Sequence, residues 1–142
     1  MGKITEENRR ELKQADKYEN AAITDMVTNS FTDILNSMFH QKKISTQTVV
    51  NKTGISKSYI NQLRSSSQKK VNPSRPKTIS IGLALDGSEE EINSLLKAAG
   101  FQPLYSRSKE ESIIIWGLLH GKNYEQIIDL LDENGFGSFL GQ

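Results

Sequence analysis

The chain has 142 residues, of which 35% are apolar, and this length and composition suffice for one hydrophobic core of ordinary size. It contains no cysteine, which excludes disulfides and thiolate metal sites, and its two histidines, His40 and His120, have no ligand-like spacing to carboxylates. No apolar run approaches the roughly 20 residues of a bilayer span, and the first residues have the features of neither a signal peptide nor a transit peptide. We therefore expect a globular cytoplasmic protein with no membrane partner, no metal and no cofactor.

The net charge of +1 conceals a separation of charge along the chain. Residues 1–29 carry five basic and six acidic side chains, residues 30–85 carry nine basic and one acidic, and residues 86–142 carry four basic and ten acidic. The middle segment thus has a net charge of +8 and the last segment a net charge of −6. A concentrated basic segment is typical of a surface that binds a polyanion, although a merely solvated basic surface has the same composition.

The first part of the chain predicts two helices after a polar start. Residues 1–29 are polar and charged, which favours an N-terminal arm or a loosely docked helix. From Phe31 the apolar side chains recur at helical spacing and predict a core-facing amphipathic helix that ends near Gln41. Ser45 is a suitable N-cap for a short second helix that continues to Lys52.

The next stretch, GISKSYINQLR at residues 54–64, predicts a tight turn and a third helix. Gly54 ends the preceding helix, because glycine adopts the left-handed conformation without steric cost, and Ser56 caps a new helix two residues later. Two short helices joined by such a turn are the helix-turn-helix pattern, in which the second helix enters the major groove of DNA. The apolar residues that would pack between these helices are Val50, Ile55, Ile60 and Leu63.

A polar loop, QKKVNPSRPK, separates this motif from two further predicted helices. The fourth helix is expected at about 77–85 and the fifth up to Ala99, beginning with a capping box of Ser88 and Glu91. The three carboxylates at 89–91 suit the positive end of the fifth helix. Helix initiation explains them better than a catalytic carboxylate pair does.

The last third of the chain predicts two more helices. Residues 108–120 are expected to be helical. The run from Ile113 to Trp116, with Leu118 and Leu119, is apolar around most of the helix circumference, so this helix must be buried on more than one side. Asn123 is expected to cap a last helix at 124–133, and the final stretch, GFGSFLGQ, is expected to be a tail. No strand pattern of period two occurs, and the predicted fold class is therefore all-α.

The segment GISKSYINQLRSS resembles the helix-turn-helix of the Cro/phage-repressor type, often called XRE-like, in which a Ser-x-x-Tyr-Ile-x-x-Leu pattern is common. The residues that fit are Gly54, Ile55, Tyr59, Ile60 and Leu63, whereas Thr53 and Val50 stand where an apolar residue and an alanine are usual. The resemblance covers residues 30–104. It implies a five-helix DNA-binding domain there, with residues 105–142 as a C-terminal helical extension for dimerisation or partner binding.

The resemblance also implies roles for individual side chains. The expected DNA base contacts are Lys57, Ser58, Asn61 and Gln62, since amides such as those of Asn and Gln can bind adenine bidentately. The expected phosphate contacts are Thr46, Gln47, Arg64, Lys69, Lys70 and Arg75, the first two assisted by the amides at a helix start. Tyr59 is expected either to touch the DNA backbone or to pack against its own helix pair.

We therefore expect a sequence-specific double-stranded DNA-binding transcriptional regulator, a repressor that binds a pseudo-palindromic operator as a homodimer. One alternative is an antitoxin-like or adaptor protein whose residues 105–142 bind a protein partner. Another is a scaffold that has lost DNA binding, against which the +8 segment argues. No catalytic residues are expected, because the sequence offers no nucleophile–base pair, phosphate-cradling glycine loop or metal cluster.

Overall fold

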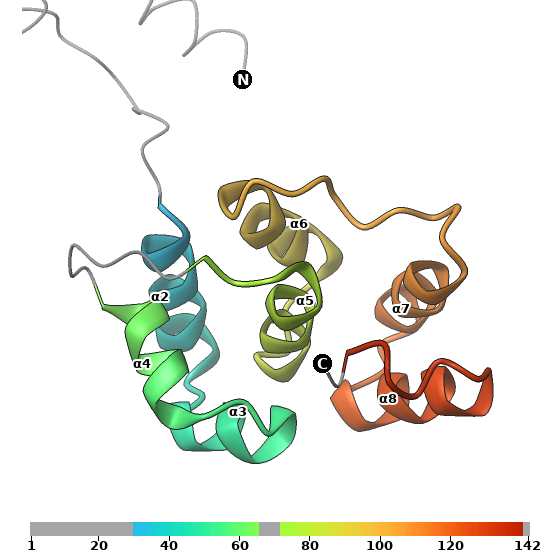
Figure 1. Cartoon of the computed structure of the whole chain (residues 1–142), viewed down its shortest axis with the longest axis horizontal. Coiled ribbons are helices and arrows are strands. Elements are labelled where there is room, and N and C mark those ends of the chain that lie inside the picture. The colour runs from blue at the N-terminus through green and yellow to red at the C-terminus, as the bar shows by residue number, and fades with distance from the viewer. Residues whose placement is uncertain (1–29, 66–71, 141–142) are drawn as a thin grey trace, which may run out of the picture.

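The computed structural model describes residues 30–65 and 72–140 of the chain and shows an all-helical fold there (Figure 1). The seven helices of these ranges are α2 (Phe31–Lys42), α3 (Thr46–Thr53), α4 (Lys57–Arg64), α5 (Arg75–Ala84), α6 (Glu89–Ala98), α7 (Lys109–Leu119) and α8 (Tyr124–Glu133), with no strand among the described residues. The all-α prediction is confirmed. The proposed arm at 1–29 lies outside the described residues.

The helices begin where polar side chains cap them, and the four N-caps expected from the sequence are confirmed. The Ser45 and Ser56 hydroxyls accept hydrogen bonds from the third backbone N–H that follows each of them. At the start of α6 the capping box is complete, because the Ser88 N–H donates to Glu91 Oε1 over 2.9 Å and the Glu91 N–H donates to the Ser88 hydroxyl over 3.1 Å. Asn123 caps α8 in the same reciprocal way. Local capping chemistry therefore sets the helix boundaries.

Helix α5 is the central helix of the fold. It begins at Arg75, earlier than predicted, because Ser74 is its N-cap and Pro76 fits the first turn. Every residue from 78 to 85 is buried, and α5 contacts both α3 and α6. A Cβ at Gly82 would lie 2.8 Å from Ile92 Cγ1, so the glycine allows α6 to approach closely. Figure 1 shows α5 between the group α2, α3 and α4 on one side and the pair α7 and α8 on the other.

Helices α7 and α8 share the hydrophobic core of the rest of the molecule. Ile114 and Ile127 are fully buried, and they belong to the same cluster as Leu35 of α2. A Cβ at Gly117 would lie 2.6 Å from Ile127 Cγ1, so a glycine is needed where α7 meets α8. Within the described ranges, no helix has the length and apolar character needed to span a membrane.

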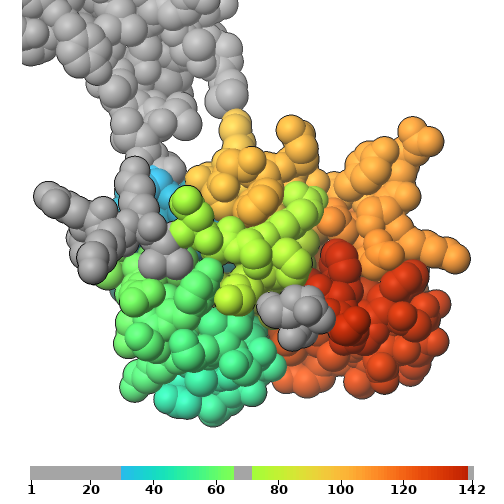
Figure 2. Space-filling model, viewed as in Figure 1, coloured from blue at the N-terminus to red at the C-terminus, as the bar shows by residue number. Residues whose placement is uncertain are grey.

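The expectation of a tail at the end of the chain is wrong. The stretch after α8 is not a free tail up to Leu140, because Phe136 and Phe139 pack against the core and Leu140 is only 6% exposed. Figure 2 shows this red C-terminal segment against the surface of α5. Helix α7 packs against both α6 and α8, as its apolar circumference predicts, but Trp116 is 46% exposed and Leu119 is 69% exposed. One face of α7 therefore remains uncovered.

Candidate nucleic-acid interface

The α4 helix has a buried face and a polar outward face. Ile60 is fully buried and Leu63 is 2% exposed, and the helix packs against α2 and α3. On the other side, the four residues expected to contact DNA bases, Lys57, Ser58, Asn61 and Gln62, are all exposed. Their i, i+1, i+4 and i+5 spacing places them on one face of the helix. In the part of the chain that the structure describes, none of these four side chains makes a hydrogen bond or an ion pair, so all are free to bind a ligand.

The turn before α4 is tightly hydrogen-bonded. Gly54 has a φ of 74°, and its N–H donates to the Val50 carbonyl over 2.9 Å. The Thr53 hydroxyl donates to the Val49 carbonyl over 2.8 Å and accepts from the Ile55 N–H over 3.1 Å. Thr53, which differs from the usual apolar residue, therefore satisfies polar groups of the turn. These bonds fix the connection from α3 to α4.

Thr46 and Gln47 lie in the first turn of α3, beside the α4 surface. The first backbone N–H groups of a helix have no intrahelical acceptor, and such groups bind anions. Gln47 is exposed, and its Nε2 donates to Asn51 Oδ1 over 2.9 Å on the same helix. The Thr46 hydroxyl is engaged as the acceptor of a 2.7 Å hydrogen bond from Arg64 Nη1. The helix start is thus available to a phosphate chiefly through its amides and Gln47.

Arg64 points into the molecule instead of outward from α4. Its Nε donates to Asn36 Oδ1 over 2.8 Å, and its guanidinium lies 4.0 Å from the centre of the Phe39 ring. The Asn36 amide also donates to the Arg64 carbonyl over 3.0 Å, and the Thr32 hydroxyl donates to the Leu63 carbonyl over 2.8 Å. Sequence reasoning missed the roles of Thr32, Asn36 and Phe39. The sequence did contain a signal for these roles, because Thr32 and Asn36 are polar residues four positions apart on an otherwise core-facing helix.

Arg75 has a different role from the phosphate contact expected of it. Its guanidinium donates to both carboxylate oxygens of Glu111 and to the carbonyls of Gln102 and Pro103. Burial by itself raises the pKa of Glu111, but the hydrogen bonds from Arg75 and the Tyr105 N–H, with the charge of Arg75, outweigh it and lower the pKa. Since these donors are all engaged within the protein, Arg75 is a link between α5 and α7. The other two expected phosphate contacts, Lys69 and Lys70, lie outside the described residues.

Tyr59 packs against the core. This agrees with the expectation of packing, the alternative to contact with the DNA backbone. It is half-buried, and this burial raises the pKa of its phenol. The Lys77 ammonium lies 4.4 Å from the centre of its ring, in cation–π geometry. Lys77 was not expected at this surface, and its contact with Tyr59 joins α5 to α4.

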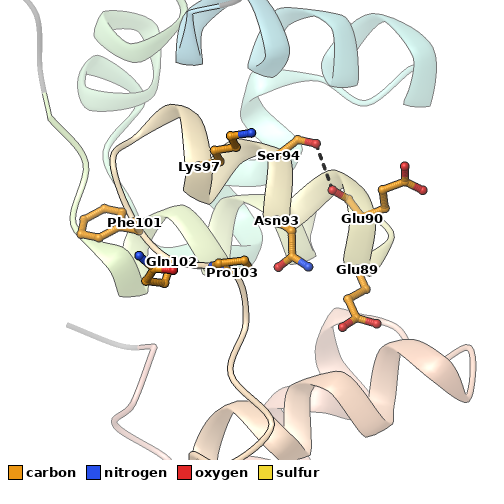
Figure 3. A pocket seen from close by; sticks show the side chains of 8 residues that line it. All are labelled: Glu89, Glu90, Asn93, Ser94, Lys97, Phe101, Gln102 and Pro103. Carbon is orange, nitrogen blue, oxygen red and sulfur yellow. Dashed lines mark hydrogen bonds between the residues drawn. The ribbon is translucent and has the colours of Figure 1, made fainter. Parts of the chain in front are cut away.

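A separate groove of the described surface lies along α6 and the segment that follows it (Figure 3). It has a volume of about 660 Å³ and is lined by Glu89, Glu90, Asn93, Ser94, Lys97, Phe101, Gln102 and Pro103. Two of its polar groups have structural roles, since Asn93 Oδ1 accepts from the Leu104 N–H and the Ser94 hydroxyl donates to the Glu90 carbonyl. No nucleophile–base pair lines it. Among the described residues, no group of three potential metal ligands is present either.

Comparisons of the chain with protein-family models, with curated proteins and with solved structures found no match.

Proposed function

We propose that the chain is a sequence-specific double-stranded DNA-binding transcriptional repressor, in which α2 to α6 form a five-helix domain of the Cro/repressor type. The observation that carries the proposal is the outward face of α4. Four exposed hydrogen-bonding side chains, Lys57, Ser58, Asn61 and Gln62, stand on a helix whose other face is fixed by Ile60 and Leu63. Side chains of these types read base edges in the major groove.

In this proposal α4 is the recognition helix and α3 supports it on the phosphate backbone. Lys57 is suited to guanine acceptors, and Asn61 and Gln62 are suited to adenine. The first turn of α3, with Gln47, binds a phosphate through helix amides. Lys69 and Lys70, in the loop after α4, are further phosphate contacts on the grounds of sequence alone. Arg64 and Arg75 are not included, since their guanidinium groups are bound within the protein.

The distribution of charge supports this orientation. Residues 30–85, which include α2 to α5, carry a net charge of +8, whereas residues 86–142 carry −6. Phosphate repels the acidic part and attracts the basic part, so the long-range field directs the α3 and α4 side of the molecule toward DNA. Figure 2 shows this side, in green and cyan, on the left and the orange and red surface of α7 and α8 on the right.

The uncovered face of α7 supports a homodimer. Trp116 and Leu119 are the most exposed large apolar residues of this helix, and the half-buried Ile115 lies beside them. One helix-turn-helix covers few base pairs, and a symmetric dimer places two recognition helices in successive major grooves. Pairing through α7 would leave α4 free. The second candidate function, an antitoxin-like or adaptor protein, uses the same face of α7 for a different protein.

The experiment that tests DNA recognition is selection of bound duplexes from a random-sequence library by the full chain. The proposal predicts that one sequence is enriched over successive rounds and that this sequence is pseudo-palindromic. Light scattering of the purified chain separates the two uses of α7. A dimer supports the repressor, and a monomer that still binds the selected duplex supports the adaptor.

A further inference from the structure

The guanidinium of Arg64 joins three helices. Arg64 is the last residue of α4, and its Nε donates to Asn36 Oδ1 of α2 over 2.8 Å. Its Nη1 donates to the Thr46 hydroxyl of α3 over 2.7 Å. The planar group also lies 4.0 Å from the centre of the Phe39 ring, and Phe39 is 3% exposed. A guanidinium can make all three contacts at once because its donors form a rigid planar fork.

The backbone at the same end of α4 is held by the same helix, α2. The Asn36 amide donates to the Arg64 carbonyl over 3.0 Å, and the Thr32 hydroxyl donates to the Leu63 carbonyl over 2.8 Å. The last carbonyls of a helix have no intrahelical donor, so these two bonds satisfy groups that would otherwise bind water. The C-terminal end of α4 is thus attached to α2 through both side chain and backbone.

The direction of the α4 axis depends on how the C-terminal end of this short helix is held. α4 has 8 residues, so a shift of its C-terminal end changes the direction of the whole axis. The exposed residues Lys57 and Gln62 lie on this short helix, near its two ends. A change in the direction of the α4 axis would therefore displace the polar groups of Lys57 and Gln62 from the bases that they would contact on DNA. Base pairs are read through hydrogen bonds that tolerate little displacement.

We infer that Arg64 is a positioning residue, which sets the direction of α4 against α2 and α3 so that the outward face of α4 can read bases. This inference rests on the proposed function and assigns Arg64 a role other than phosphate contact. A phosphate contact requires only a positive charge in reach. Positioning requires the guanidinium shape and its partner Asn36.

The test compares Arg64→Lys, which keeps the charge, with Asn36→Ala, which changes no charge. Ser37→Ala, at an exposed neighbouring position on α2, is the matched control. Fluorescence anisotropy measures the affinity of each full-length variant for the duplex selected by the wild-type chain and for a scrambled duplex of the same length, over a series of salt concentrations. Circular dichroism melting establishes that each variant is folded at the temperature of the assay.

Both Arg64→Lys and Asn36→Ala are expected to lower the affinity for the selected duplex roughly tenfold, the size of effect of one lost charge-assisted hydrogen bond. For both variants, the affinity for the scrambled duplex and the slope of affinity against salt concentration should equal those of the wild type. Ser37→Ala should match the wild type in both duplex affinities and in the salt slope. Wild-type affinity in Arg64→Lys would overturn the inference, and so would an equal loss on both duplexes. If the wild-type chain enriches no duplex at all, the proposed function fails and the inference fails with it.

Discussion

Arg75 of α5 and Glu111 of α7 form a two-point ion pair, in which Arg75 Nε and Nη2 donate to the two carboxylate oxygens of Glu111 over 2.8 and 2.7 Å. The Glu111 carboxylate also accepts from the Tyr105 N–H over 2.8 Å. Glu111 is only 6% exposed. A residue of the basic segment thus binds a residue of the acidic segment, so the charge separation in the sequence does not divide the fold into independent parts.

This pair predicts a large effect of Glu111→Ala on stability. Removing the carboxylate leaves the guanidinium and the Tyr105 N–H without their acceptor, and loss of one partner of a buried ion pair costs several kcal/mol. Because the Arg75 side chain is 24% exposed, we expect the free energy of unfolding to fall by about 2–3 kcal/mol. Urea denaturation measures it. Asp129→Ala, at an exposed position of α8, is the control and should change stability by less than about 0.5 kcal/mol.

The lowered pKa of Glu111 predicts how stability depends on pH. Its pKa lies below the ordinary value of 4.5, because the bonds and charge of Arg75 and the Tyr105 N–H outweigh the effect of burial. The pKa of Glu91 is lowered as well. Burial raises it, but the hydrogen bonds with Ser88 and Lys42 and the charge of Lys42 outweigh the effect of burial. A group whose pKa is lower in the folded state stabilises the protein above its unfolded pKa, and this stabilisation is lost as the pH falls through the folded pKa.

The wild-type chain should therefore lose stability as the pH falls below 4.5, and Glu111→Gln should lose less over the same interval. Urea denaturation at a series of pH values measures both. Asp129→Asn serves as the control for removal of an acidic charge from the same part of the molecule. Parallel curves for wild type and Glu111→Gln would show that Glu111 has the same pKa in the folded and unfolded states.

A third prediction concerns base reading by α4. Gln62→Ala should weaken binding to the selected duplex by about 1–3 kcal/mol and leave binding to a scrambled duplex nearly unchanged, because only a base contact depends on sequence. Gel-shift titrations with both duplexes measure the two affinities. Gln41→Ala, at an exposed position of α2 away from the proposed interface, is the control. A loss of the same size on both duplexes would assign Gln62 to the phosphate backbone.

A fourth prediction concerns the uncovered face of α7. Leu119 is 69% exposed, so Leu119→Glu should leave the fold intact while placing a charge in the proposed dimer contact. Sedimentation equilibrium should show a dimer for the wild type and a monomer for this variant. Tyr105→Glu, at a position 53% exposed outside α7, is the matched control and should remain a dimer. A dimeric Leu119→Glu would place the contact on another surface.

Much of the fold could be predicted because its determinants are local. The caps Ser45, Ser56 and Ser88 are each recognised within a few residues of sequence, and the apolar spacing of α4 identifies Ile60 and Leu63 as its buried face. The start of α5 was misplaced since Ser74 stands inside a loop-like sequence that contains two prolines. Local patterns thus give the elements and the outward face of α4.

The partners of the arginines could not be predicted in the same way. Arg64 binds a residue 28 positions away and Arg75 one 36 positions away, and a positive charge in a sequence carries no information on such distant partners. The packing of Phe139 and Leu140 was missed for a related reason, because they follow two glycines without helical spacing. The exposure of Trp116 was missed because an apolar helix face in a sequence does not show whether residues of the same chain cover it.

The most direct test of DNA binding by a symmetric dimer is the effect of half-site spacing on affinity. Two α4 helices of one dimer should protect two half-sites on the same face of the selected duplex, with centres about 34 Å or 10–10.5 base pairs apart. Inserting about five base pairs between them rotates one half-site to the opposite face of the duplex. With this insertion, footprinting should show one protected half-site, and the affinity for the duplex should fall sharply. Undiminished affinity with the insertion, or protection of a single half-site in the original duplex, would contradict binding by a symmetric dimer.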